Sequence, residues 1–161
     1  MKGYKPKLHY HYVYWELPQE GGLKSNTNGA SRGNPGESTF SFCVRNHDGN
    51  LLYAEASMIG IKTYLEDEIV AILKALRYCK CNKILKVLIE TDSLGVAKMI
   101  RKEWKIPWNQ AKEMEEVQEI MQDIQARIKH VFREANQLVE KLVNETYIQH
   151  GIKQWTNFQQ L

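Results

Sequence analysis

The chain has 161 residues, a formal net charge of +3, 43% hydrophobic residues and 25% charged residues. These values are typical of one ordinary globular domain with its own core. No apolar run approaches the roughly 20 residues that a membrane span needs, and residues 1–7 lack the apolar core of a secretory signal. Three cysteines, an odd count, argue against a disulfide framework. We therefore expect an intracellular protein of the nucleus or cytoplasm that is not secreted and does not bind membranes.

The first half of the chain predicts an arm followed by strands. Residues 1–20 are aromatic and basic and indicate an N-terminal arm, the domain itself spans 21–150, and 151–161 form a C-terminal tail. Strand-like runs lie at 23–28, 39–44 and 51–59. Asp48-Gly49 between the last two is typical of a tight hairpin turn. These strands are therefore expected to lie antiparallel.

The second half alternates helices and strands. Apolar residues at helical spacing predict a helix over 63–80 with Thr63 as its N-cap. A strand at 84–90, helices at about 93–103 and 109–126, a strand at 127–133 and a helix at 135–149 follow. This order predicts a mixed α/β sheet with helices on both faces.

Three acidic residues are placed where such a fold would bring them together. Glu68 lies in the first turns of a helix, Asp92 follows a central strand, and Glu140 lies in the last helix. Binding sites in α/β sheets form at the carboxyl ends of the strands, and clustered carboxylates there are stabilised by paired Mg²⁺ ions. The competing interpretation is that the three acids are solvated or cap their elements.

Four motifs in order resemble the ribonuclease H family, especially its plant retroelement-type (reverse transcriptase-like) domains. Asn-Thr-Asn-Gly-Ala-Ser-Arg-Gly-Asn-Pro-Gly at 26–36 resembles the family's Asn-x-Asp-Gly-Ala-x-x-Gly-Asn-Pro-Gly. The other three motifs of the family are matched by Asp-Glu-Ile-Val-Ala-Ile at 67–72, Glu-Thr-Asp-Ser at 90–93 and Arg-Glu-Ala-Asn-Gln-Leu-Val-Glu-Lys-Leu-Val at 133–143. The resemblance runs from about residue 15 to 147.

The resemblance implies an RNase H-like fold with a mixed five-stranded sheet, three antiparallel strands then two parallel ones, and helices on both faces. It also implies cleavage of the RNA strand of an RNA/DNA hybrid with two Mg²⁺ ions, or Mn²⁺ in their place. The catalytic positions, which are also the metal ligands, are Asn28, Glu68, Asp92 and Glu140.

Two of these positions depart from the family. Glu140 replaces an Asp and keeps its charge, whereas Asn28 replaces the Asp that bridges both metals. A neutral amide should weaken Mg²⁺ binding, because hard cations are held by charged oxygens. Three explanations remain for Asn28: natural decay of the enzyme, a deliberate inactivating change, or a tolerated ligand. Drift at other positions favours natural decay.

The resemblance also implies substrate-binding residues. Gly33 and Asn34 would meet RNA 2′-hydroxyls, Thr63 would bind a phosphate, and Ser93 and Asn136 match further family positions. The polar residues that usually follow the Thr are Tyr and Leu at 64 and 65, and the glycines expected after Gly-Asn-Pro-Gly are missing at 37–41.

Three functions follow as hypotheses. The favoured one is a hybrid-binding RNase H-like domain with impaired or lost cleavage; the others are an active hybrid ribonuclease and a protein-interaction scaffold. Trp104 and Trp108, beside basic residues, would either stack on a DNA strand or leave one Trp in the core. His130 invites comparison with a mobile catalytic histidine, but we expect it to face solvent or pack on its strand.

Overall fold

The computed structural model describes residues 22–149 and 153–156. The predicted arm at 1–20 and most of the predicted tail lie outside the described residues. In the described part, six strands form one sheet in the order β5-β4-β1-β2-β3-β6. β1 (Lys24–Gly33), β2 (Gly36–Arg45) and β3 (Leu51–Lys62) are antiparallel, and β4 (Leu88–Thr91) and β5 (Arg127–His130) continue the sheet in parallel from β1. The predicted RNase H-like fold class and strand arrangement are confirmed.

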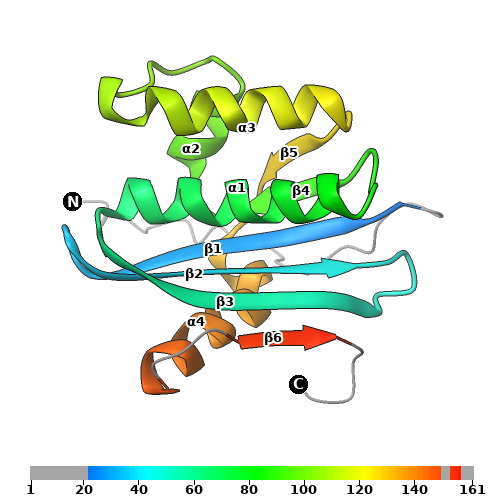
Figure 1. Cartoon of the computed structure of the whole chain (residues 1–161), viewed down its shortest axis with the longest axis horizontal. Coiled ribbons are helices and arrows are strands. Elements are labelled where there is room, and N and C mark those ends of the chain that lie inside the picture. Colours follow the sequence, from blue (N-terminus) through cyan, green and yellow to red (C-terminus); the bar gives the residue numbers. More distant parts are fainter. Residues whose placement is uncertain (1–21, 150–152, 157–161) are drawn as a thin grey trace, which may run out of the picture.

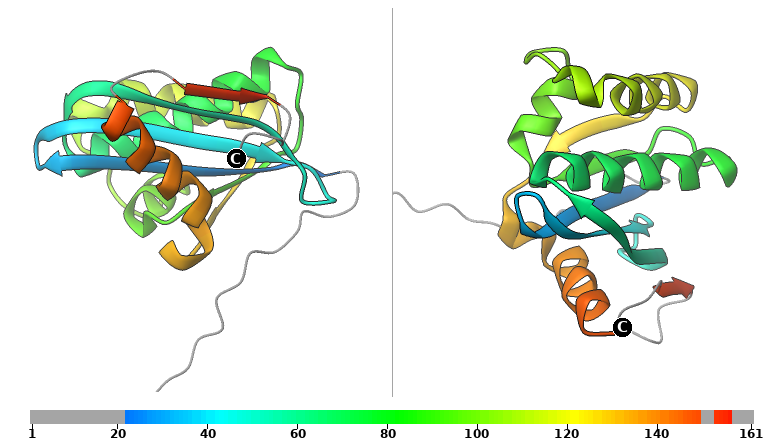
Figure 2. Two further views of the ribbon diagram at one scale, coloured as in Figure 1. Left: turned by 90° about the horizontal axis from the view of Figure 1, so that it is seen from below. Right: turned by 60° about the vertical axis from the view of Figure 1, so that its left-hand side comes forward.

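The helices cover both faces of the sheet, as predicted (Figure 1). α1 (Tyr64–Cys81), α2 (Leu94–Ile100) and α3 (Ala111–Asp123), with the short 3₁₀ helix η1 (Trp108–Gln110), lie on one side. The 3₁₀ helix η2 (Arg133–Asn136) leads into α4 (Gln137–Gln149), which packs on β1, β2 and β3 from the other side (Figure 2). Among the helices of the described residues, none combines the length and apolar character needed to cross a bilayer.

Three strands, β1, β2 and β3, are longer than predicted, and two, β4 and β5, are shorter. β1 continues past Asn28 to Gly33, and β2 begins already at Gly36. The two strands pair all the way to the turn that joins them. β4 begins only at Leu88, since Lys83 and Lys86 adopt positive φ angles of 55° and 57° that interrupt an extended chain. The predicted Asp48-Gly49 turn is present, with φ +78° at the glycine.

A further strand, β6 (Lys153–Thr156), lies in the segment for which the sequence predicts only a tail. It pairs antiparallel with residues 53–56 of β3. A four-residue strand is set by the partner that it pairs with rather than by its own pattern, so the sequence alone carries little signal for it.

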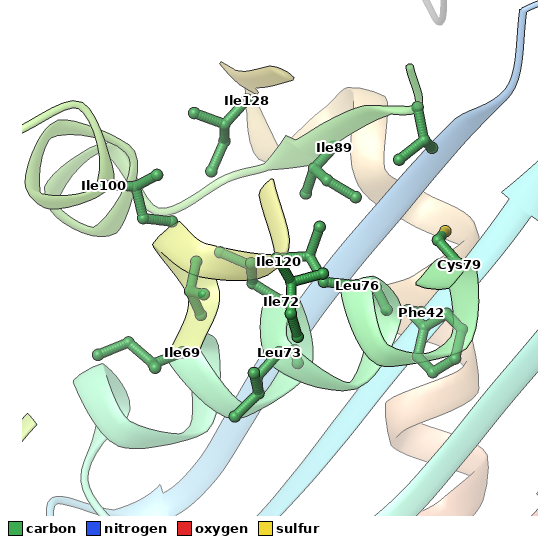
Figure 3. Close-up of a cluster of buried hydrophobic side chains, with 14 of the residues drawn as sticks. Phe42, Ile69, Ile72, Leu73, Leu76, Cys79, Ile89, Ile100, Ile120 and Ile128 are labelled. Carbon is green, nitrogen blue, oxygen red and sulfur yellow. The ribbon is translucent and has the colours of Figure 1, made fainter. Parts of the chain in front are cut away.

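The sheet separates two hydrophobic cores. The larger lies under α1, α2 and α3, where Ile69, Ile72 and Leu76 form the buried stripe of α1 (Figure 3). The smaller lies under α4 and consists of Cys43, Leu51, Ala54, Ala56, Val139 and Leu142. Because β1 and β2 are packed from both faces, their polar residues are held in fixed positions.

Candidate active site

The strand register brings Asn28 and Asp92 together. Thr27 of β1 pairs with Thr91 of β4, and β4 ends there. Asn28, which is still in β1, and Asp92, the first residue after β4, therefore lie side by side where the two chains separate. Asn28 is buried, with 7% of its surface exposed. This carboxyl end of the sheet is where α/β folds form their sites.

Glu68 reaches the same point from α1, because the helix packs very closely on β1. A Cβ added at Gly29 would lie 2.4 Å from the carbonyl carbon of Asp67 and 2.5 Å from the backbone nitrogen of Glu68. Only glycine permits this approach. The Gly29 N–H stabilises the ionised Glu68 carboxylate, so the backbone next to Asn28 positions this side chain.

Burial disfavours the charge of both Glu68 and Asp92, and the Asp92 carboxylate further disfavours the charge of Glu68. Burial, then Asp92 and Asp67, raise the pKa of Glu68 well above its usual value. Burial also raises the pKa of Asp92, and Glu140 adds to this effect. Oε2 of Glu68 is buried and accepts no hydrogen bond from any described residue. A buried carboxylate oxygen without a donor is costly, so this pair favours a cation.

Arg133 already supplies one positive charge at the site. Its guanidinium hydrogen-bonds Oε1 of Glu140 through Nε at 3.0 Å and also through Nη2. It also lowers the pKa values of Asp92 and Glu68 against the larger effect of burial. Glu140 is therefore part of the same electrostatic cluster, but its carboxylate is directed to Arg133.

The oxygen atoms of these side chains are of the type that binds a divalent metal, but their positions fit such a metal only partly. Carboxylate oxygens are the ligands that Mg²⁺ prefers, and the orphaned Oε2 of Glu68 beside Asp92 is such a ligand. Within residues 22–149 and 153–156, however, no three acidic, histidine or cysteine side chains converge to hold a metal ion. The structure therefore offers a carboxylate pair, with Glu140 as a third ligand only if it leaves Arg133.

Asn136 lies inside the protein and holds the start of α4 against the sheet. Its Nδ2 donates to the carbonyl of Thr27 at 2.7 Å, and its Oδ1 accepts from Nδ2 of Asn26 at 3.1 Å. Asn26 also contacts Glu90, which forms a buried ion pair of 3.2 Å with Lys24. With 2% of its surface exposed, Asn136 positions α4 on the sheet, and its assignment as a substrate-binding residue stays a prediction.

The other predicted substrate residues also have partners within the chain. Gly33 adopts φ +124° in the exposed β1–β2 turn, and the neighbouring Asn34 accepts a hydrogen bond from the Tyr64 N–H at 3.1 Å. Thr63 is the N-cap of α1, as predicted, and Ser93 is the N-cap of α2, accepting from the Val96 N–H at 3.4 Å. The four predicted substrate residues that have a side chain thus all use it in a hydrogen bond within the fold.

The residues left open by the sequence are now placed. His130 pairs with Thr91 in the sheet, its charge lowers the pKa of Asp92, and its ring meets Phe132 edge-on at 5.9 Å. It therefore packs against its own segment of chain, as expected, and has only a minor electrostatic effect on Asp92. Trp104 and Trp108 are 49% and 89% exposed, so the interpretation that places one of them in the core is wrong.

Asp67 is the polar residue near the site that sequence reasoning missed. Its side chain is turned under α1 and is 1% exposed, and neither oxygen accepts a well-formed hydrogen bond from a described residue. Ser38 lies close and weakly favours the charge, but its hydroxyl donates to the carbonyls of Gly36 and Lys62. Burial raises the pKa of Asp67 to about 7.

Comparison with known proteins identifies the family and the fold of the chain. A family model described as reverse transcriptase-like matches residues 26–146. No curated protein sequence matches the chain.

Solved structures with the same fold include RNases H1. RNase H1 of Halobacterium salinarum is 24% identical, with a TM-score of 0.75, over 79% of this chain and 98% of that one. LC11-RNase H1, in complex with an RNA/DNA hybrid and isolated from compost, is 23% identical, with a TM-score of 0.71, over 76% and 94%. An N-terminal RNase H domain of Mycobacterium tuberculosis is 21% identical, with a TM-score of 0.74, over 79% and 94%.

Proposed function

Since the chain belongs to the reverse transcriptase-like family, we propose that it binds RNA/DNA hybrid and that Asn28 impairs its cleavage of the RNA strand. The hybrid as ligand is supported by the fold that the chain shares with LC11-RNase H1, which has been solved with such a hybrid. The position of Asn28 carries the proposal of impaired cleavage. It lies next to Asp92 at the end of the parallel strands and offers a neutral amide where a metal-bridging carboxylate is expected.

The residues around Asn28 have separate roles in this proposal. Glu68 and Asp92 would hold a divalent cation, which when bound would stabilise negative charge on the scissile phosphate. The Gly29 N–H orients Glu68, and Arg133 holds Glu140. With Asn28 in place of an anion, the site carries one negative charge fewer, so the cation is held more weakly.

The decisive experiment is an RNA/DNA hybrid cleavage assay with Mg²⁺ and with Mn²⁺, on the unchanged chain and on Asn28→Asp. We expect the variant to cleave more than about 100-fold faster, because even the loss of a partner that merely supports a ligand costs 10–100-fold. The control is Asn28→Asp combined with Glu68→Gln, which should lose the gain. Intact mass must accompany each assay, since Asn28-Gly29 is a sequence prone to deamidation and would generate Asp.

The results separate the three functions. Strong cleavage by the unchanged chain would refute the impairment and support an active ribonuclease. The buried Oε2 of Glu68, which accepts no hydrogen bond from a described residue, favours this second function because it is available to a metal. Binding of hybrid that weakens as salt rises, without cleavage, supports the proposal, because phosphate contacts release counterions. If neither form binds hybrid, the nucleic-acid function is wrong and a protein partner is indicated.

A further inference from the structure

The first turn of α1 is closed by side chains of the protein itself. Oγ1 of Thr63 accepts from the Glu66 N–H at 3.2 Å, and Oε2 of Glu66 accepts from the Thr63 N–H at 2.7 Å. A third donor, the Tyr64 N–H, is bound by Oδ1 of Asn34 at 3.1 Å. The N–H groups at the start of a helix have no partner within the helix and commonly bind anions such as phosphate. Here three of them have internal acceptors.

The acceptor at the centre of this turn is itself an anion. The hydrogen bond from the Thr63 N–H, with smaller contributions that include Lys62, lowers the pKa of Glu66, so it is ionised at neutral pH. Its carboxylate accepts the hydrogen bond from the Thr63 N–H and interacts favourably with the positive end of the helix dipole. Both interactions would otherwise favour a bound phosphate.

The surface around this helix end is partly apolar. Ile61 and Tyr64, on either side of Lys62 and Thr63, are 64% and 53% exposed. A phosphate approaching Thr63 would therefore meet the charge of Lys62, an apolar residue on either side of that turn, and the negative charge of Glu66.

We propose that Glu66 is an internal substitute for phosphate that keeps the N-terminus of α1 closed to the nucleic-acid backbone. The phosphate contact that the resemblance implies for Thr63 is then absent in this chain. Glu66 becomes a residue that limits affinity for hybrid. The closure stands on the geometry of α1 alone, and its effect on hybrid binding rests on the proposed function.

Two variants test the closure directly. Glu66→Ala removes both the charge and the hydrogen bond to Thr63, whereas Glu66→Gln keeps a capping side chain and removes only the charge. Glu119→Ala, an exposed acidic position on α3 near the other end of α1, is the matched control. Thr63 still caps the helix in all of them.

The first readout is titration with inorganic phosphate against chloride at constant ionic strength, following the backbone amide NMR signals of residues 63–66. We expect saturable shifts in Glu66→Ala, smaller ones in Glu66→Gln, and none in the unchanged chain or in Glu119→Ala. Saturable shifts in the unchanged chain, or none in Glu66→Ala, would overturn the proposal.

The second readout is hybrid affinity as a function of salt. Glu66→Ala should bind more tightly, and the slope of log K against log salt should steepen by about 0.9, the value for one added phosphate contact. An unchanged slope in Glu66→Ala, in a chain that binds hybrid, would refute the role in affinity. If no form binds hybrid, the proposed function fails, while the phosphate titration still decides whether the helix end is closed.

Discussion

The buried carboxyl of Asp67 should make the protein less stable as the pH rises. Its pKa is raised from the ordinary 3.8 to about 7, and its side chain is 1% exposed. The folded state therefore holds a proton that the unfolded chain releases at lower pH. Between about pH 4 and 7 the unfolded state binds fewer protons than the folded state, so the free energy of unfolding falls as the pH increases.

The size of the effect follows from the shift. At 1.36 kcal/mol for each pKa unit, the change from 3.8 to about 7 corresponds to a loss of about 4 kcal/mol, complete above pH 7. Asp67→Asn removes the ionisation and keeps a side chain of similar size. Its free energy of unfolding should therefore exceed that of the unchanged chain by an amount that grows by up to about 4 kcal/mol across this pH range.

The assay is urea unfolding followed by circular dichroism at pH values from 4 to 8, in a chelator so that no metal binds. Because Glu68 and Asp92 also titrate, the quantity to compare is the difference between variant and unchanged chain at each pH. Asp123→Asn, at an exposed acid paired with Lys80, is the control and should show a difference that hardly changes with pH. A constant difference for Asp67→Asn would refute the reasoning.

Two further changes test how the site is supported. Gly29→Ala should cost about 1–3 kcal/mol or more of unfolding free energy, because its Cβ would lie 2.4 Å from the backbone of Asp67. A loss under about 1 kcal/mol by urea unfolding would contradict the close packing. Lys24→Met should cost about 3–5 kcal/mol, since it leaves Glu90 buried beside a neutral residue. Lys24→Met combined with Glu90→Gln should recover much of that loss, and no recovery would show that the ion pair is not its source.

The fold was predictable because its signals are local and repeated. The apolar stripe of Ile69, Ile72 and Leu76 and the cap at Thr63 define α1 within one stretch of sequence. The turn at Gly49 fixes the β2–β3 hairpin in the same way. β6 has no such signal, because four residues gain their strand conformation only from the edge of β3.

The site was predictable in position but not in its contacts. Motif spacing indicated that Asn28, Glu68 and Asp92 would converge, and strand register and electrostatics place them together. The internal role of Asn136 depends on Thr27, more than one hundred residues earlier, so no local pattern reports it. Asp67 and Glu68 are adjacent acidic residues in α1, and the sequence does not show which of the two is turned under the helix. The assignments of the predicted catalytic residues and of Asn136 as a substrate residue stay predictions for the assays above.

The pairing of β6 with β3 also determines how much of that sheet edge is open to another chain. An edge strand presents unpaired N–H and C=O groups to which another chain can add a strand. β6 covers residues 53–56 of β3, and Gly60 in the remaining part, with φ +83°, interrupts the extended backbone that an incoming strand would need. A shortened chain that ends before Lys153 would leave residues 53–56 of β3 unpaired. Aggregation of that chain during purification would then result from the exposed edge of the sheet rather than from an unfolded domain.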